Sequence, residues 1–168
     1  PALFREPTPD FRSIPFWSLN DELEPAEIRR QLAAFKEGGF GGAYLHSRIG
    51  LLTPYLDDDW WRAMDAGVDA CDELGIEAWF YDEDKWPSGF AGGIVPRLDA
   101  AYRARVLVRL KSGTPLPQHC EALAGDGGYQ YVCWVEPLGD AWFNGTSWVD
   151  LFNPDCVKAF IECSYKPY

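Results

Sequence analysis

Basic residues are scarce in this sequence of 168 residues. Lys and Arg together number 15 against 26 Asp and Glu, which leaves a formal net charge of −11. A surface that binds phosphate groups needs clustered positive charge, so the composition argues against nucleic acid and against an anionic membrane as partners. No run of residues has the length and apolar character of a transmembrane helix.

Cysteine pairs of the kind that bind zinc are also missing. The five cysteines are an odd number and include no CxxC motif, which predicts neither a zinc site nor a disulfide framework. Cys71, Cys156 and Cys163 fall in predicted helices, where we expect buried thiols. Unpaired cysteines favour a cytoplasmic location.

The motifs of several enzyme classes are absent. The sequence has no GxSxG, HExxH, P-loop or GxGxxG, so serine-hydrolase, zinc-protease and nucleotide-binding functions have no support. It has only two histidines, and His119 lies in a loop without any functional signal. Aromatic residues are abundant instead, with eight Trp, eight Tyr and ten Phe. Most of these rings are expected in the core, but Trp near loops can also stack on sugar rings.

Strands and helices alternate over the first half of the chain. Apolar strands are predicted to begin near residues 15, 42 and 77, with pairing of the first strand starting after Pro15. A first helix begins at Glu24-Pro25 and ends at Gly38, and a second runs from the acidic residues at 57–59 to Gly75. We predict that the apolar side of this second helix carries Trp61, Met64, Val68, Cys71 and Leu74. The spacing is typical of βαβ units and predicts an α/β fold with a parallel sheet.

The pattern changes after residue 102. Segments 104–110 and 129–135 are predicted strands of an antiparallel sheet, residues 112–128 a loop, and residues 141–149 a hairpin with an Asn144-Gly145 turn. Asn153-Pro154 is predicted to begin a last helix. The predicted organisation is therefore 1–102 as N-terminal βα units, 103–150 as a β-rich insertion and 151–168 as a returning helix.

Polar and aromatic side chains follow each of the three parallel strands. Functional groups of α/β barrels lie at the carboxyl ends of the strands, and planar polar side chains suit sugar hydroxyls, which both donate and accept hydrogen bonds. Trp17 or Trp86 could offer a face for stacking. The candidate substrate-binding residues are Trp17, Asn20, His46, Arg48, Asp82, Glu83, Asp84 and Trp86.

Two of these candidates have alternative explanations. His46 could be a purely structural histidine or a site residue. The acidic run 82–84 could be a solvated, helix-capping turn, a sugar-binding group or a site for a divalent cation, because hard cations prefer several carboxylate oxygens. Its spacing fits no EF-hand loop. Three carboxylates so close together would also raise the pKa of one of them.

A resemblance to a known family is carried by the predicted helix with the Trp-Trp pair and by four segments: PFWSLNDELEPAEIRRQL, GFGGAYLHSRIGLLTPYL, AWFYDEDKWPSGFAGG and DLFNPDCVKAF. They resemble the N-terminal half of the catalytic barrel of hypothetical bacterial glycosyl hydrolases, which are distantly similar to the α-L-rhamnosidases of family 106. The resemblance covers about residues 12–95 and then 150–160, and YDEDKWPSG and HSR are its most specific parts.

This resemblance implies a partial (β/α)8 barrel of TIM type, formed by the first three βα units, with sugar bound at the strand ends. The implied substrate site contains His46, Arg48, Asp82, Glu83, Asp84 and Trp86. The catalytic carboxylates of such barrels follow strands four and seven, so the resemblance implies that this chain alone is inactive. Hydrolysis ordinarily needs two acids about 5 to 10 Å apart.

Three functions therefore stay open at the level of sequence. The first is the sugar-binding part of a glycosidase barrel, whose open sheet edges would pair with another chain or with the rest of a longer one. The second is a carbohydrate-binding or scaffold module without turnover. The third is a metal-dependent hydrolase or isomerase that uses His46 with Asp82 or Asp84 and a divalent cation.

Overall fold

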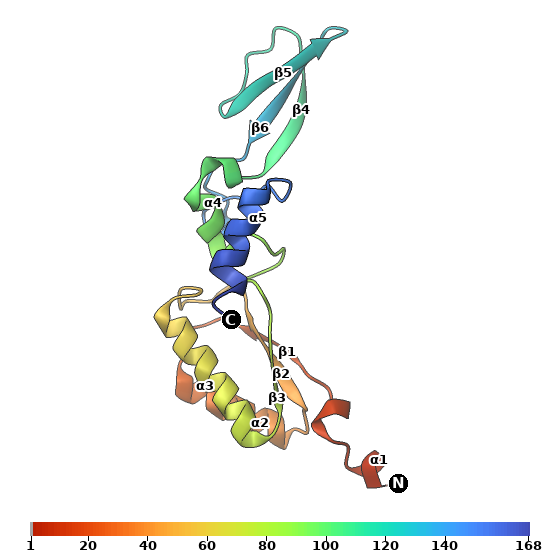
Figure 1. Cartoon of the computed structure of the whole chain (residues 1–168), viewed down its shortest axis with the longest axis vertical. Coiled ribbons are helices and arrows are strands. Elements are labelled where there is room, and N and C mark those ends of the chain that lie inside the picture. The colour runs from red at the N-terminus through yellow and green to blue at the C-terminus, as the bar shows by residue number, and fades with distance from the viewer. Residues whose placement is uncertain (1) are drawn as a thin grey trace. The chain divides into compact units, whose positions relative to one another are not determined.

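The chain contains two compact units, Pro1–Pro87 and Ser88–Tyr168. The computed structural model in Figure 1 describes residues 2–168. The first unit contains a parallel sheet and the second an antiparallel sheet. The prediction of an α/β protein that also carries an antiparallel sheet is confirmed.

The parallel sheet of the first unit has three strands in chain order, β1-β2-β3. Its pairing starts at Phe16 and Tyr44, directly after Pro15, which lacks the N–H that a ladder needs. The predicted starts of all three strands are confirmed. The strands are β1 (Phe16–Leu19), β2 (Gly42–Ser47) and β3 (Glu77–Phe80).

Two helices connect these strands, α2 (Pro25–Glu37) and α3 (Asp58–Leu74), both as predicted. The Asp57 side chain accepts a hydrogen bond of 2.9 Å from the backbone N–H of Trp60 and so caps α3. Gly75 ends α3 in the left-handed conformation at φ 61°. Both helices lie on the same side of the sheet (Figure 1), as right-handed crossovers require when the strands follow in order.

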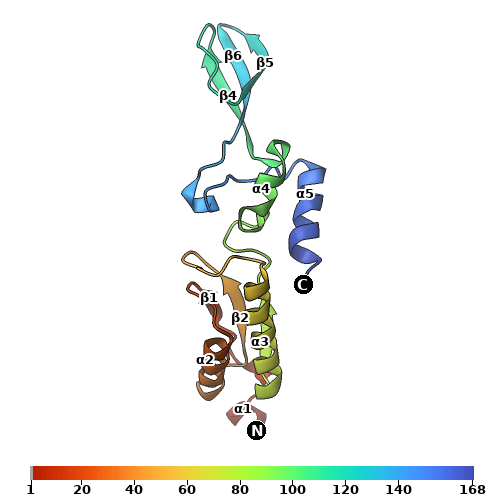
Figure 2. The same cartoon turned by 90° about the vertical axis from the view of Figure 1, so that its left-hand side faces the viewer.

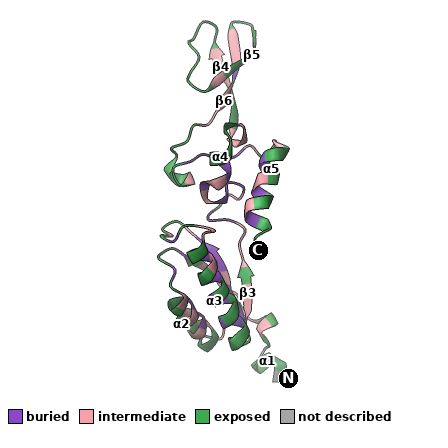
Figure 3. Ribbon diagram, turned by 60° about the vertical axis from the view of Figure 1, so that its left-hand side comes forward, coloured by how far each residue is buried: buried purple, intermediate pink, exposed green. Residues whose placement is uncertain are grey.

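The core of the first unit lies between the sheet and these helices, and Figure 3 shows α3 with a buried and an exposed side. Met64 and Cys71 are buried as predicted, and Trp61 and Leu74 are partly buried against the same core. Val68, in contrast, is 40% exposed, and Trp60, which was not predicted, is buried. Small residues of α3 face the sheet and bring the helix close to it. Even the single Cβ that a larger residue would add at Gly67 would lie only 3.0 Å from the side chain of Leu45. The prediction for Val68 was wrong because it followed the large side chains, whereas the small ones allow the helix to pack closely.

The antiparallel sheet of the second unit has the order β4-β6-β5. Residues 104–110 and 129–135 form strands as predicted, whereas the prediction of a loop over 112–128 is wrong for its second half. That half is a Gly- and Ala-containing edge strand, almost fully exposed, which is held by backbone pairing to β6 and interrupted by a bulge. The strands are β4 (Arg105–Lys111), β5 (Cys120–Asp126) and β6 (Tyr129–Val135).

The predicted hairpin over residues 141–149 is also wrong. Ala141–Phe143 forms a single 3-10 turn, in which the side chain of Asp140 accepts a hydrogen bond from the backbone N–H of Trp142. Asn144 then adopts the left-handed conformation at φ 54°, and only one isolated bridge, between Asp140 and Thr146, joins the two sides. The Asn-Gly pair therefore ends a helical turn here and does not connect two strands.

Helices α4 (Ile94–Leu98) and α5 (Pro154–Phe160) lie side by side in the second unit (Figure 1, Figure 2). Asn153 caps α5 as predicted, since its side chain accepts a hydrogen bond of 3.0 Å from Asp155 N–H. A second apolar core includes Phe90, Val95 and Cys156. The remaining helical segments are α1 (Ala2–Arg5), a π-helical stretch (Ile161–Tyr165) and 3-10 turns at Pro9–Phe11, Ala91–Gly93 and Ala100–Tyr102.

All five cysteines are free in the structure. Cys71 and Cys156 are buried in helices, and burial raises the pKa of the Cys71 thiol to about 11. Across residues 2–168, no helix combines the length and apolar character needed to cross a membrane.

Candidate functional site

The carboxyl ends of the three parallel strands meet at one edge of the sheet. The register places Leu19 opposite Ser47, so the segments that follow β1 and β2 start side by side. The backbone N–H of Arg48 donates to the carbonyl of Leu19 at 2.9 Å and continues this alignment beyond β2. The predicted site residues therefore lie along or just after this edge.

Trp17 and His46 nevertheless point to opposite faces of the sheet. Trp17 is paired with Leu45 and His46 with Ser18, and successive side chains of a strand alternate between faces. The Trp17 ring packs edge-on against Phe35 of α2, with ring centroids 5.2 Å apart. Trp17 thus belongs to the helix side and does not join His46.

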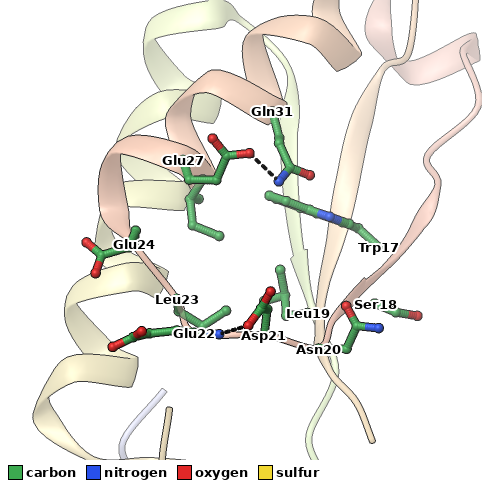
Figure 4. A pocket seen from close by; sticks show the side chains of 11 residues that line it. Trp17, Ser18, Leu19, Asn20, Asp21, Glu22, Leu23, Glu24, Glu27 and Gln31 are labelled. Carbon is green, nitrogen blue, oxygen red and sulfur yellow. Dashed lines mark hydrogen bonds between the residues drawn. The ribbon is translucent and has the colours of Figure 1, made fainter. Parts of the chain in front are cut away.

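Figure 4 shows the pocket in which Trp17 and Asn20 lie, between the end of β1 and the start of α2. It has a volume of about 210 Å³. Its lining residues include four acids and no basic side chain. They are Trp17, Ser18, Leu19, Asn20, Asp21, Glu22, Leu23, Glu24, Glu27, Ile28 and Gln31.

One acid of this pocket, Glu27, accepts hydrogen bonds from two side chains. Arg30 donates to it at 2.7 and 2.5 Å, and Gln31 donates at 2.8 Å, the bond drawn in Figure 4. The Arg30 hydrogen bonds, followed by that of Gln31, lower the pKa of Glu27 to about 2. The carboxylate therefore stays ionised throughout the physiological range.

His46 lies on the face of the sheet that the helices leave free. Its ring stacks on Tyr81 with centroids 4.1 Å apart and meets the edge of Phe16 at 4.4 Å. The side chain is 0% exposed, yet neither Nδ1 nor Nε2 has a hydrogen-bond partner among the residues that the structure describes. A buried polar group without a partner costs about 1 to 3 kcal/mol, so this position calls for an explanation.

The environment keeps His46 neutral. Burial, and then the positive charge of Arg48, lower its pKa from 6.5 to about 4, while the negative charge of Asp82 acts in the opposite direction. At neutral pH the imidazole accordingly has one N–H donor and one acceptor nitrogen. Arg48 and Asp82, two other predicted site residues, therefore act electrostatically on His46.

Arg48 itself is partly buried. Its guanidinium forms no hydrogen bond or ion pair with any residue in the described range 2–168. A guanidinium carries five N–H donors and stays charged at every physiological pH. Arg48 is therefore an available cation beside a neutral imidazole.

The loop after β3 is less exposed than its sequence suggests. Glu83, Asp84 and Lys85 are 0%, 3% and 6% exposed, and Lys85 Nζ lies 3.8 Å from Asp84 Oδ2. Glu83 Oε1 accepts a hydrogen bond of 2.9 Å from the backbone N–H of Asp84. The alternative of a solvated, helix-capping acidic turn is therefore wrong for Glu83 and Asp84. Trp86 is 65% exposed and leaves an indole face open to solvent.

No group of three or more His, Cys, Asp and Glu side chains within residues 2–168 is arranged to hold a metal ion.

The sequence interpretation missed two members of the His46 cluster, Phe16 and Tyr81. The alternation of side chains along a strand could have predicted the contact with Phe16, because Phe16 lies two residues before Ser18, the register partner of His46.

No protein-family model, no curated protein and no solved structure matches this chain.

Proposed function

We propose that the carboxyl edge of the parallel sheet binds a carbohydrate through the face that carries His46. The observation behind this proposal is the buried imidazole, whose two nitrogens have no hydrogen-bond partner among the described residues. A neutral imidazole offers one donor and one acceptor, and a sugar hydroxyl can serve either. The ring is covered in this structure, so a ligand hydroxyl must displace a covering side chain to reach it, and would then remove the cost of the unsatisfied group.

The neighbours of His46 suit the same class of ligand. Asp82 can accept hydrogen bonds from hydroxyl groups, and Arg48 can donate them. The exposed indole of Trp86 could stack on the apolar face of a sugar ring. A combination of charged and aromatic groups at one site is typical of small-molecule recognition.

We further propose that the first unit is part of a glycoside-hydrolase barrel of (β/α)8 type. The strand order β1-β2-β3 with both helices on one face supports this, because barrel strands follow in sequence and the helices form an outer ring. The opposite face carries large rings, including Phe16, Tyr44 and Trp79, and side chains on that face of a barrel fill its interior.

The proposal assigns binding, and not bond cleavage, to these residues. Glycoside hydrolysis ordinarily uses two carboxylates on either side of the scissile bond, about 5 to 10 Å apart. Asp82, Glu83 and Asp84 come from a single loop, and the last two are buried. A carbohydrate-binding module without turnover would share this geometry.

Titration of the 168-residue chain with monosaccharides and their p-nitrophenyl glycosides tests the proposal. We expect at least one sugar to shift the NMR signals of His46 and Arg48, and Asp82→Asn to weaken that sugar about tenfold or more, as expected for a charged hydrogen bond. Asp65→Asn, an exposed acid on α3, is the matched control and should leave binding unchanged.

Two further results decide between the alternatives. Saturating sugar that leaves the His46 and Arg48 signals unmoved would rule out binding at this site. Binding without release of p-nitrophenol would favour a module without turnover, whereas release that survives Asp82→Asn would place catalysis elsewhere.

A further inference from the structure

Arg48 lacks the side-chain partners that most arginines of the first unit have. The chain carries a net charge of −11. The guanidinium of Arg48 nevertheless forms no hydrogen bond or ion pair with residues 2–168. In contrast, four arginines of this unit bind carboxylates or carbonyls: Arg12, Arg29, Arg30 and Arg62.

Arg48 lies on the same side of the sheet as His46. Between them, Ser47 points toward the helices, because its Oγ accepts a hydrogen bond of 2.8 Å from Trp60 Nε1. Alternation of side chains then directs positions 46 and 48 to the opposite face. The influence of Arg48 on His46 agrees with this placement.

The inference rests on the proposed function and specifies its substrate class. We infer that the carbohydrate bound at this edge carries a carboxylate, as a hexuronic acid does, and that Arg48 binds this carboxylate. The planar guanidinium can donate two parallel hydrogen bonds to one carboxylate. A neutral sugar would leave a partly buried positive charge without a counterion, which is unfavourable.

The charges around the site favour a ligand with a single negative charge. Arg48 and Asp82 carry opposite charges near the neutral His46. A ligand carboxylate would form an ion pair with the guanidinium of Arg48, which has no side-chain partner among residues 2–168. A phosphate monoester, at about −1.5 to −2, would leave excess negative charge beside Asp82. Sugar hydroxyls remain suitable partners for Asp82, which can accept their hydrogen bonds.

Paired ligands that differ only in charge test this inference. D-glucuronate and D-galacturonate are titrated into the 168-residue chain beside their neutral methyl esters and glucose 6-phosphate. We expect one acid to bind at least tenfold more tightly than its ester. Arg48→Gln should reduce that acid-to-ester ratio to about one, even if the ester also binds more weakly to the variant. Arg62→Gln, which removes an exposed positive charge on α3, should keep the ratio.

A second variant changes the charge in the opposite direction. Asp82→Asn removes a negative charge from the site, so the acid-to-ester ratio should rise even if both ligands bind more weakly. This variant decides the question if Arg48→Gln does not fold. A ratio that falls or stays constant in Asp82→Asn would contradict the inference.

The outcomes also separate the inference from the proposed function. Acids and esters that bind equally well, or a ratio that persists in Arg48→Gln, would refute carboxylate recognition while carbohydrate binding stands. Tighter binding of glucose 6-phosphate than of either acid would show that the site recognises a phosphate group instead of a carboxylate, which would refute the inference. If no acid, ester or neutral sugar binds, the proposed function fails and the inference fails with it.

Discussion

Acidification should destabilise the first unit through His46. The pKa of this histidine is about 4 in the folded chain and 6.5 in its ordinary state, and burial is the main cause of the difference. Because the folded pKa is the lower one, the unfolded chain binds more protons between these values. Stability is therefore highest above pH 6.5 and is lost as the pH falls toward 4.

The size of this effect follows from the two pKa values. Each pKa unit corresponds to about 1.4 kcal/mol, so a difference of about two and a half units amounts to roughly 3 kcal/mol. The comparison variant is His46→Phe, which keeps a ring between Phe16 and Tyr81 and removes both unpartnered nitrogens. We expect its stability at pH 7 to equal or exceed that of the native chain, because removing an unsatisfied polar group is favourable.

Urea unfolding followed by tryptophan fluorescence at pH 7, 6, 5 and 4 measures the difference. The native chain should lose about 3 kcal/mol relative to His46→Phe over this range. The exposed His119 provides the control, since His119→Asn should retain the native pH dependence. Parallel curves for the native chain and His46→Phe would refute the conclusion that His46 is held neutral by its surroundings.

Three further predictions concern stability and are all measured by denaturant unfolding. Trp60→Ala should cost about 3 to 5 kcal/mol, because it empties a buried site in the core; a loss below 1 kcal/mol would contradict this core assignment. Asp57→Ala should cost about 0.5 to 2 kcal/mol through loss of the α3 cap, with no effect expected from Asp57→Asn. Gly93→Ala should destabilise more than Gly75→Ala, because both have positive φ but only the added Cβ at Gly93 meets Thr146, at 2.9 Å. Equal losses of stability in Gly93→Ala and Gly75→Ala would show that the strain of a positive φ alone, and not the contact with Thr146, sets the cost.

Much of the fold could be predicted from local signals. Helix α2 begins at a proline and α3 ends at a left-handed glycine, and both features act within a few residues of the sequence. Strand β5 could not be predicted in this way, because its residues are exposed and its strand conformation depends on backbone pairing with β6. The turn at Asn144 was misassigned because a left-handed Asn fits a helical turn as well as a hairpin.

The candidate site was predictable in its location and less so in its composition. Residues that follow parallel strands must meet at one edge, and Asn20, His46, Arg48 and Asp82 do lie along it. The placement of Trp17 and His46 on opposite faces of the sheet follows from the alternation of side chains, but only after the register of β1 and β2 is known. The aromatic partners of His46 were missed because they come from other parts of the chain, Phe16 from β1 and Tyr81 from the residue after β3.

The sequence by itself determined the order of strands and helices in the first unit, their capping residues and the class of fold, because hydrophobic periodicity, proline and glycine act locally. Only the tertiary structure decided which side chains are buried and therefore how they ionise. The imidazole of His46 is neutral because Phe16 and Tyr81, distant in sequence, close around it. The burial of Glu83 and Asp84 likewise depends on chain packing, which no local pattern of charges records.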